Sequence, residues 1–219
     1  MRAPDPAALP GYDYWLFDLD GTLVDADWSY VRATFDRAGR RLGRQFSDRE
    51  AARLWHGLAG ERNALLRRWG VDPPAFWRAF HAAERPADRA AATRLHPDAA
   101  FVRDLSVPTG VVTHCQPFLA DPVLDALDLR EWFDVVVCCT DETGWKPDPG
   151  PVEHALSALG VDAGGHGVFA GDMPSDVGAA WGAGLDAVHV ERHGPERRGY
   201  CVRADYRVSS FAELASAPA

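Results

Sequence analysis

Two aspartates stand directly after a short apolar run in the first part of the chain. The run Tyr14–Phe17 is followed by Asp18 and Asp20, and then by Gly21. Two carboxylates at this spacing, followed by a glycine that allows a tight turn, interrupt a strand and can direct acidic groups toward a metal ion and a substrate. In an open parallel sheet, the carboxyl end of a strand is where ligands bind. Taken alone, the stretch also fits a polar turn without a function.

Two other apolar runs end in polar residues. Thr113 ends the run Gly110–Thr113, and its hydroxyl and the free N–H groups beside it can hold a phosphate oxygen. The alternative is a β-branched residue that completes a strand. Asp172 follows the run Val168–Ala170 at a point suited to binding a hard cation through oxygen. Asp176 lies at the expected start of a helix, where it either joins the site or stabilises the helix N-terminus.

Lys146 is the only lysine among the 23 Lys and Arg residues of the chain. It lies in a loop rich in Gly and Pro, where an exposed lysine is the ordinary interpretation. Because arginine replaces lysine everywhere else, the single lysine indicates a position where the larger guanidinium does not fit. A compact cation there can neutralise both a carboxylate and a phosphoryl group.

The elements that must position these residues follow from the hydrophobic pattern. Residues 28–92 have helical periodicity, with a capping box at Ser47–Glu50 and a helix start at Asp72, and we expect a separate helical subdomain. Strands and helices then alternate, which predicts a parallel sheet with right-handed crossovers. The expected strands are 14–18, 110–113, 135–139, 168–170 and 187–190, and the expected helices lie near 119–128, 151–159 and 175–183.

Composition excludes several classes of function. The net charge of −9 over 219 residues argues against non-specific binding to nucleic acid. We find no apolar run long enough to span a membrane and no signal peptide, so we expect a cytoplasmic protein without a membrane partner. The four cysteines are expected to be unpaired thiols. The acidic, lysine-poor composition fits either a halophile or a G+C-rich genome.

Taken together, these segments resemble the four motifs of the haloacid dehalogenase (HAD) superfamily of phosphohydrolases. Asp18-x-Asp20-Gly-Thr matches the first motif, Thr113 the second, Lys146-Pro the third and Gly171-Asp172-x-x-x-Asp176 the fourth. The helical block resembles the type-1 cap of phosphoglycolate-phosphatase-like members. The resemblance implies an α/β fold with a Rossmann-like parallel sheet core, formed by 1–24 and 96–219, and an inserted α-helical cap at 25–95.

The resemblance also implies a mechanism. Asp18 attacks the phosphorus of a monoester, and Asp20 protonates the leaving group and later activates water. Asp18, the backbone carbonyl of Asp20 and Asp172 hold Mg²⁺, with Asp176 in support. Thr113 and Lys146 stabilise the phosphoryl oxygens. The residues expected to contact substrate are Thr22, Thr113, His114 and Arg62.

The expected substrate is a small phosphorylated metabolite, and the expected assembly is a monomer or homodimer. Arg62 follows a stretch that resembles the cap specificity loop, where it either binds a distal anionic group or is an exposed charge at a helix start. His114 stands where many relatives carry Asn. The carboxylate of Asp20 argues against a dehalogenase, and a cap without lysine argues against a phosphonoacetaldehyde hydrolase. A phosphosugar mutase and a non-catalytic HAD-like binding or regulatory protein are the alternatives.

Overall fold

The computed structural model describes residues 11–161 and 164–215, which form two compact units. The core unit comprises the described parts of Met1–Asp25, Arg94–Arg192 and Val202–Ala219. The helical unit comprises Ala26–Thr93 and His193–Cys201. The chain therefore passes from one unit to the other four times.

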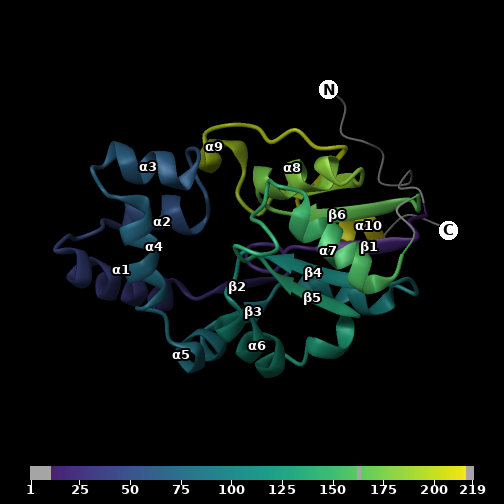
Figure 1. Cartoon of the computed structure of the whole chain (residues 1–219), viewed down its shortest axis with the longest axis horizontal. Helices are drawn as coiled ribbons and strands as arrows, with labels where there is room; N and C mark the ends of the chain where they lie inside the picture. Colours follow the sequence, from purple (N-terminus) through teal and green to yellow (C-terminus); the bar gives the residue numbers. More distant parts are fainter. Residues whose placement is uncertain (1–10, 162–163, 216–219) are drawn as a thin grey trace. The chain divides into compact units, whose positions relative to one another are not determined.

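A six-stranded parallel sheet forms the centre of the core unit, with the order β5-β4-β1-β6-β7-β8 (Figure 1). Its strands are β1 (Tyr14–Phe17), β4 (Thr109–Thr113), β5 (Val135–Cys138), β6 (Gly167–Gly171), β7 (Asp186–Val190) and β8 (Tyr206–Val208). After β5 the chain returns to the other side of β1 and continues outward. β1 therefore lies at the topological switch point, where the crevice at the carboxyl ends of the strands opens.

Both faces of the sheet are covered, which explains why its strands are apolar without alternation. On one face, α7 (Gly150–Leu159) packs against β4 and β5, and α8 (Pro174–Gly182) packs against β6 and β7. On the other face, Trp15 and Phe17 join a cluster with η2 (Pro97–Asp104) and α6 (Pro117–Ala126). The short elements η3 (Arg130–Trp132) and α10 (Ala212–Ala215) complete the core unit. The predicted α/β architecture with a Rossmann-like parallel sheet is confirmed.

The helical unit contains α1 (Trp28–Leu42), α2 (Asp48–Trp55), α3 (Arg62–Arg68), α4 (Pro73–His81) and α5 (Pro86–Ala91). As predicted, Ser47 and Glu50 form a capping box on α2, and the Asp72 side chain accepts the N–H of Ala75 at the start of α4. Phe35, Phe76 and Phe80 lie in the centre of its apolar core.

Residues 193–201 pack with the helical unit, although the sequence pattern groups them with the core. This segment carries the short helix α9 (Pro195–Arg198). The carbonyl of Arg198 accepts the N–H of Ala59 at 2.9 Å, and the Tyr200 hydroxyl donates to the carbonyl of Gly57 at 3.2 Å. These bonds attach a late segment of the chain to the loop between α2 and α3.

A two-stranded sheet, β2 (Val24–Ala26) with β3 (Thr93–Leu95), lies where the chain enters and leaves the helical unit. Strands of three residues are too short to show a periodicity, so the sequence pattern does not predict them. The longest described helix, α1, has 15 residues, and no described helix combines the length and apolarity needed to cross a membrane.

Candidate active site

The predicted site residues of the core unit come from the carboxyl ends of three adjacent strands. Asp18 follows β1, Thr113 ends β4, and Asp172 follows β6. Because β4 and β6 are the two neighbours of β1, parallel pairing brings these ends to one edge of the sheet. The sheet topology therefore assembles residues that are far apart in the sequence.

Lys146 joins this edge through three hydrogen bonds. Its Nζ donates to Oδ1 of Asp18 at 2.7 Å and to the carbonyl of Val112 at 2.8 Å, and it lies 2.7 Å from Oδ1 of Asp176. An ammonium has three N–H donors, so all of them are in use. The Lys146 side chain is 1% exposed and lies over the ring of Phe169, 5.2 Å from its centre. The single lysine is therefore a buried ion-pair partner and not an exposed loop residue.

The electrostatics of this cluster are dominated by burial. Burial raises the pKa of Asp18 against the opposing charge of Lys146, and the neighbouring Asp176 adds to the rise. For Lys146, burial favours the neutral amine, but Asp176 and Asp18 outweigh it and hold the pKa above its ordinary value. The proton therefore stays on Lys146, whose ammonium lies against the carboxyl groups of Asp18 and Asp176.

Three buried carboxylates lie together beside this lysine. One oxygen each from Asp18, Asp172 and Asp176 falls within a group whose atoms are all within 4.8 Å of one another. Three carboxylates and one ammonium carry a net negative charge in a water-poor site, which is unfavourable without a further cation. The donors are all oxygen atoms, the ligands that Mg²⁺ prefers. The residues present therefore fit a divalent cation.

Gly21 and Gly171 allow this close packing of carboxylates. Gly21 has a φ of +82°, and a Cβ there would lie 2.8 Å from Cγ of Asp172. A Cβ at Gly171 would lie even closer to the side chain of Asp176, whose Oδ2 accepts the N–H of Met173 at 2.8 Å at the start of α8. Asp176 thus both caps its helix and pairs with Lys146. The sequence offered helix capping and membership of the site as alternatives, and the side chain does both.

The remaining predicted residues of the core unit differ in exposure. Thr113 is buried, and its Oγ1 accepts the N–H of Cys115 at 3.1 Å. His114 is partly exposed, and its ring lies 5.8 Å from that of Trp145. Asp20 is partly exposed in the turn after β1, outside the group of three carboxylates, and Thr22 is fully buried.

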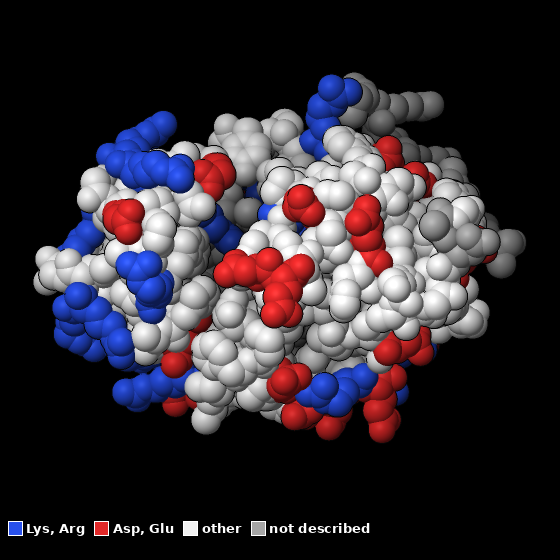
Figure 2. Space-filling model, viewed as in Figure 1, with Lys and Arg blue, Asp and Glu red and all other residues white. Residues whose placement is uncertain are grey.

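Arg62 belongs to the helical unit, at the first position of α3, and its Nη2 donates to the carbonyl of Trp55 at 3.0 Å. Arg62, Arg197 and Arg198 disfavour a charge on His56, whose pKa falls to about 4 mainly through burial. The unit contains 15 Arg and nine acidic residues, a net charge of +6, although the whole chain carries −9. On the face shown in Figure 2, Arg side chains gather over α1 and α3.

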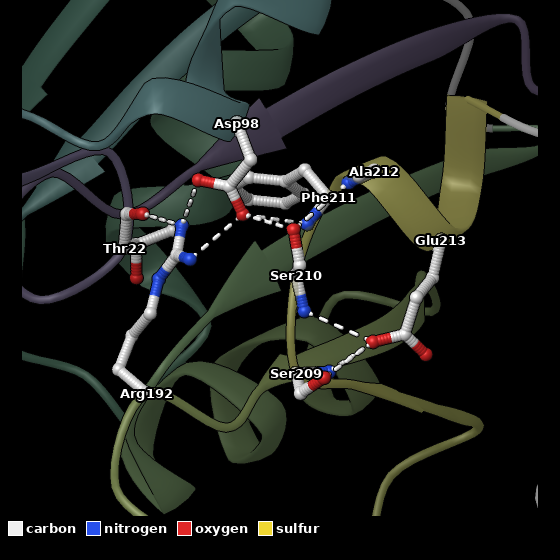
Figure 3. Close-up of polar contacts among 8 residues, drawn as sticks. All are labelled: Thr22, Asp98, Arg192, Ser209, Ser210, Phe211, Ala212 and Glu213. Carbon is white, nitrogen blue, oxygen red and sulfur yellow. Dashed lines mark hydrogen bonds and ion pairs between the residues drawn. The ribbon is translucent and has the colours of Figure 1, made fainter.

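A polar network beside the turn after β1 has no counterpart among the predicted site residues. Arg192, just after β7, donates from Nη1 to Oδ2 of Asp98 at 2.7 Å and from Nη2 to the carbonyl of Thr22 at 2.8 Å (Figure 3). Asp98 also accepts bonds from Ser210 and from the N–H of Phe211. In a chain with so many arginines, nothing in the sequence distinguishes Arg192.

Known proteins resemble this chain over most of its length. Residues 12–184 match the family model of haloacid dehalogenase-like hydrolases. A phosphoglycolate phosphatase of Pseudomonas syringae pv. tomato is 30% identical over 184 residues, covering 79% of this chain and 67% of the relative. PpaX of Caldanaerobacter subterraneus subsp. tengcongensis, named as a candidate pyrophosphatase, is 29% identical over 185 residues and 80% of each chain. The structure of CbbY from Rhodobacter sphaeroides in complex with phosphate is 26% identical, with a TM-score of 0.72 over 93% of this chain and 96% of that one.

Proposed function

This chain belongs to the haloacid dehalogenase-like hydrolases, and we propose that it is a Mg²⁺-dependent phosphatase of small phosphomonoesters that works through an aspartyl-phosphate. The observation that carries the proposal is the buried group of Asp18, Asp172 and Asp176 with Lys146 as its cation. The related phosphoglycolate phosphatase and the phosphate complex of CbbY support a phosphorylated substrate. A compound like phosphoglycolate is the first candidate.

Asp18 is the proposed nucleophile. Its main chain is held by the bond from its N–H to the carbonyl of Ala170 at 2.9 Å, and its side chain is held by Lys146. One carboxylate oxygen forms a bond to phosphorus while the bond from phosphorus to the alcohol oxygen breaks. A nucleophile held in place before substrate binds loses little further entropy during the reaction.

Asp20 is the proposed acid and base. Its carboxyl gives a proton to the departing alcohol oxygen and later takes one from the water that attacks phosphorus, which releases phosphate and restores Asp18. The Thr113 hydroxyl accepts one bond, so its own proton is available for a phosphoryl oxygen. Lys146 holds Asp18 and limits the negative charge of the site.

Asp18, the backbone carbonyl of Asp20 and Asp172 are the proposed holders of Mg²⁺. The cation supplies positive charge that offsets the negative charges of the carboxylates and of a phosphate. We rank the mutase alternative below the phosphatase, because the mutases that this family resemblance brings into question rely on a cap lysine, and the only lysine of this chain, Lys146, lies in the core unit. We place the enzyme in the cytoplasm, as a monomer or homodimer.

The proposal is tested by phosphate release from a panel of small monoesters, with pyrophosphate included because of the resemblance to PpaX. Activity should require Mg²⁺ and should fall by about 10³-fold or more in Asp18→Asn. Asp172→Asn should raise the Mg²⁺ concentration needed for half-maximal activity, whereas the exposed Asp125→Asn is a control and should behave as wild type. Turnover that survives chelation of Mg²⁺, or that survives in Asp18→Asn, contradicts the mechanism.

A further inference from the structure

Asp18 and Asp20 are held in place by different means. Asp18 continues from β1 and is bonded to the neighbouring strand through Ala170. Asp20 lies beyond the sheet, in a turn that closes around the carbonyl of Leu19, which accepts the N–H groups of Leu23 and Val24 at 3.0 Å each. The position of the acid and base therefore depends on the turn, not on the sheet.

The carbonyl of Thr22 is the point at which this turn is bonded to a distant side chain. It accepts Nη2 of Arg192 at 2.8 Å, across a separation of 170 residues. Thr22 is fully buried and Arg192 is 12% exposed, so water competes little for this bond. The contact joins the turn to the end of β7.

Asp98 orients the arginine. Its two carboxylate oxygens accept Nη1 at 2.7 Å and Nη2 at 3.0 Å, while Ser210 and the N–H of Phe211 bond to Oδ2. These bonds lower the pKa of Asp98 to about 2 despite its partial burial. The guanidinium also lies over the ring of Phe211, 5.4 Å from its centre. Figure 3 shows this arrangement, in which one planar group is held by several fixed partners.

We propose that Arg192 is a positioning residue for the reaction: by holding the carbonyl of Thr22, it fixes the turn that carries Asp20 where this carboxyl can give its proton to the leaving oxygen. The inference rests on the proposed function. Among the hydrogen bonds found in the described residues, the Arg192 side chain bonds only to Asp98 and to the backbone carbonyl of Thr22, and it acts through the turn.

The two carboxylates have different roles in phosphoryl transfer, because Asp18 attacks phosphorus and Asp20 protonates the leaving oxygen. Asp18 keeps its bonds to Ala170 and Lys146 when Arg192 is changed, so attack on phosphorus should be spared. Proton donation by Asp20 should suffer, and this step matters most when the leaving alcohol is a poor leaving group. The loss of activity should therefore depend on the leaving group.

The test compares Arg192→Lys and Arg192→Gln with wild type on two substrates. One is the best alkyl monoester of the panel, and the other is 4-nitrophenyl phosphate, whose phenolate departs with little need for a proton. We expect kcat/KM, which reports the steps through formation of the aspartyl-phosphate, to fall by about 10- to 100-fold for the alkyl ester and by less than about 3-fold for the aryl ester. A fall in kcat that both esters share reports the later hydrolysis step, in which Asp20 activates water. Asp98→Asn should also lower activity on the alkyl ester more than on the aryl ester. The loss should be smaller than in the Arg192 variants, because the bond between Arg192 and Thr22 stays in place.

Arg207→Gln is the matched control, because Arg207 pairs at 2.6 Å with Glu191, the residue before Arg192, and no hydrogen bond found in the described residues joins its side chain to the turn. This variant should not alter the ratio of activity on the alkyl ester to activity on the aryl ester. Equal losses of kcat/KM on both ester types in the Arg192 variants overturn the positioning role, and so does loss of folding in both variants with Arg207→Gln intact. Failure of the proposed function gives a different result: wild-type turnover that survives chelation of Mg²⁺, or turnover that survives in Asp18→Asn.

Discussion

Nζ of Lys146 lies 2.7 Å from Oδ1 of Asp18, although 128 residues separate them in the chain. The pair is almost fully buried, and a second carboxylate, Asp176, approaches the same nitrogen at 2.7 Å. A buried charge without its partner is strongly destabilising, so this contact concerns folding as well as catalysis.

Lys146→Met should leave two buried carboxylates without their cation. We expect a loss of about 3–5 kcal/mol in the free energy of unfolding and a fall in kcat of about 10²-fold or more. Urea denaturation and phosphate release measure the two effects. Lys146→Arg keeps the charge but adds bulk beside the ring of Phe169, so it should fold better than the Met variant without recovering kcat. Wild-type kcat in Lys146→Arg would show that the lysine is not required for its size.

Gly21→Ala should damage the site through contact with Asp172. Gly43 is the matched control, since its φ of +64° is also positive but a Cβ there meets nothing within 4 Å. Both alanine variants should lose about 1–2 kcal/mol of stability from the left-handed backbone. Only Gly21→Ala, whose Cβ would lie 2.8 Å from Cγ of Asp172, should also weaken Mg²⁺ binding, measured by calorimetry. Equal Mg²⁺ affinity in the two variants would contradict this role of the glycine.

Asp98 should make the free energy of unfolding depend on pH within a narrow acidic range. Its pKa falls from the ordinary 3.8 to about 2 in the folded protein, so the folded state binds fewer protons than the unfolded state between these values. Its stabilisation is complete above about pH 4 and is lost as the pH falls through about 2, amounting to about 1–2 kcal/mol after screening by solvent. In Asp98→Asn the free energy of unfolding should decline less steeply over this range. An unchanged slope would exclude Asp98 as a source of the acid sensitivity.

Arg62 should influence which substrate binds. If it meets a distal anionic group, Arg62→Gln should raise KM by about 10-fold for monoesters that carry a carboxylate and should leave uncharged analogues unaffected. The positive charge of the helical unit favours such a role. Arg67→Gln, an exposed change on the same helix, is the control and should leave both KM values unchanged. If Arg62→Gln changes KM equally for both kinds of substrate, Arg62 has a structural role and does not bind the distal group.

Much of the core unit could be predicted because its strands are continuous apolar runs that end in polar residues. The predicted strand 110–113 corresponds to β4, and the predicted helix 151–159 corresponds to α7. The strands β2 and β3 were missed, since three residues are too few to show a period. The helix α9 and its attachment to Gly57 and Ala59 depend on contacts between distant segments, which no local pattern records.

By itself, the sequence determined the kinds of chemical group in this protein and their order along the chain: Asp18 and Asp20 before a glycine, Thr113 and Asp172 at the ends of apolar runs, and Lys146 in a loop between the latter two. This is local information, because strand periodicity and turn residues act over a few neighbours. Only the tertiary structure decided which groups meet. It directed the three N–H bonds of Lys146 to Asp18, Asp176 and the carbonyl of Val112, and it brought Arg192 to Thr22. Such contacts follow from the strand order and from close packing in a buried interior, where each charged group must find a partner.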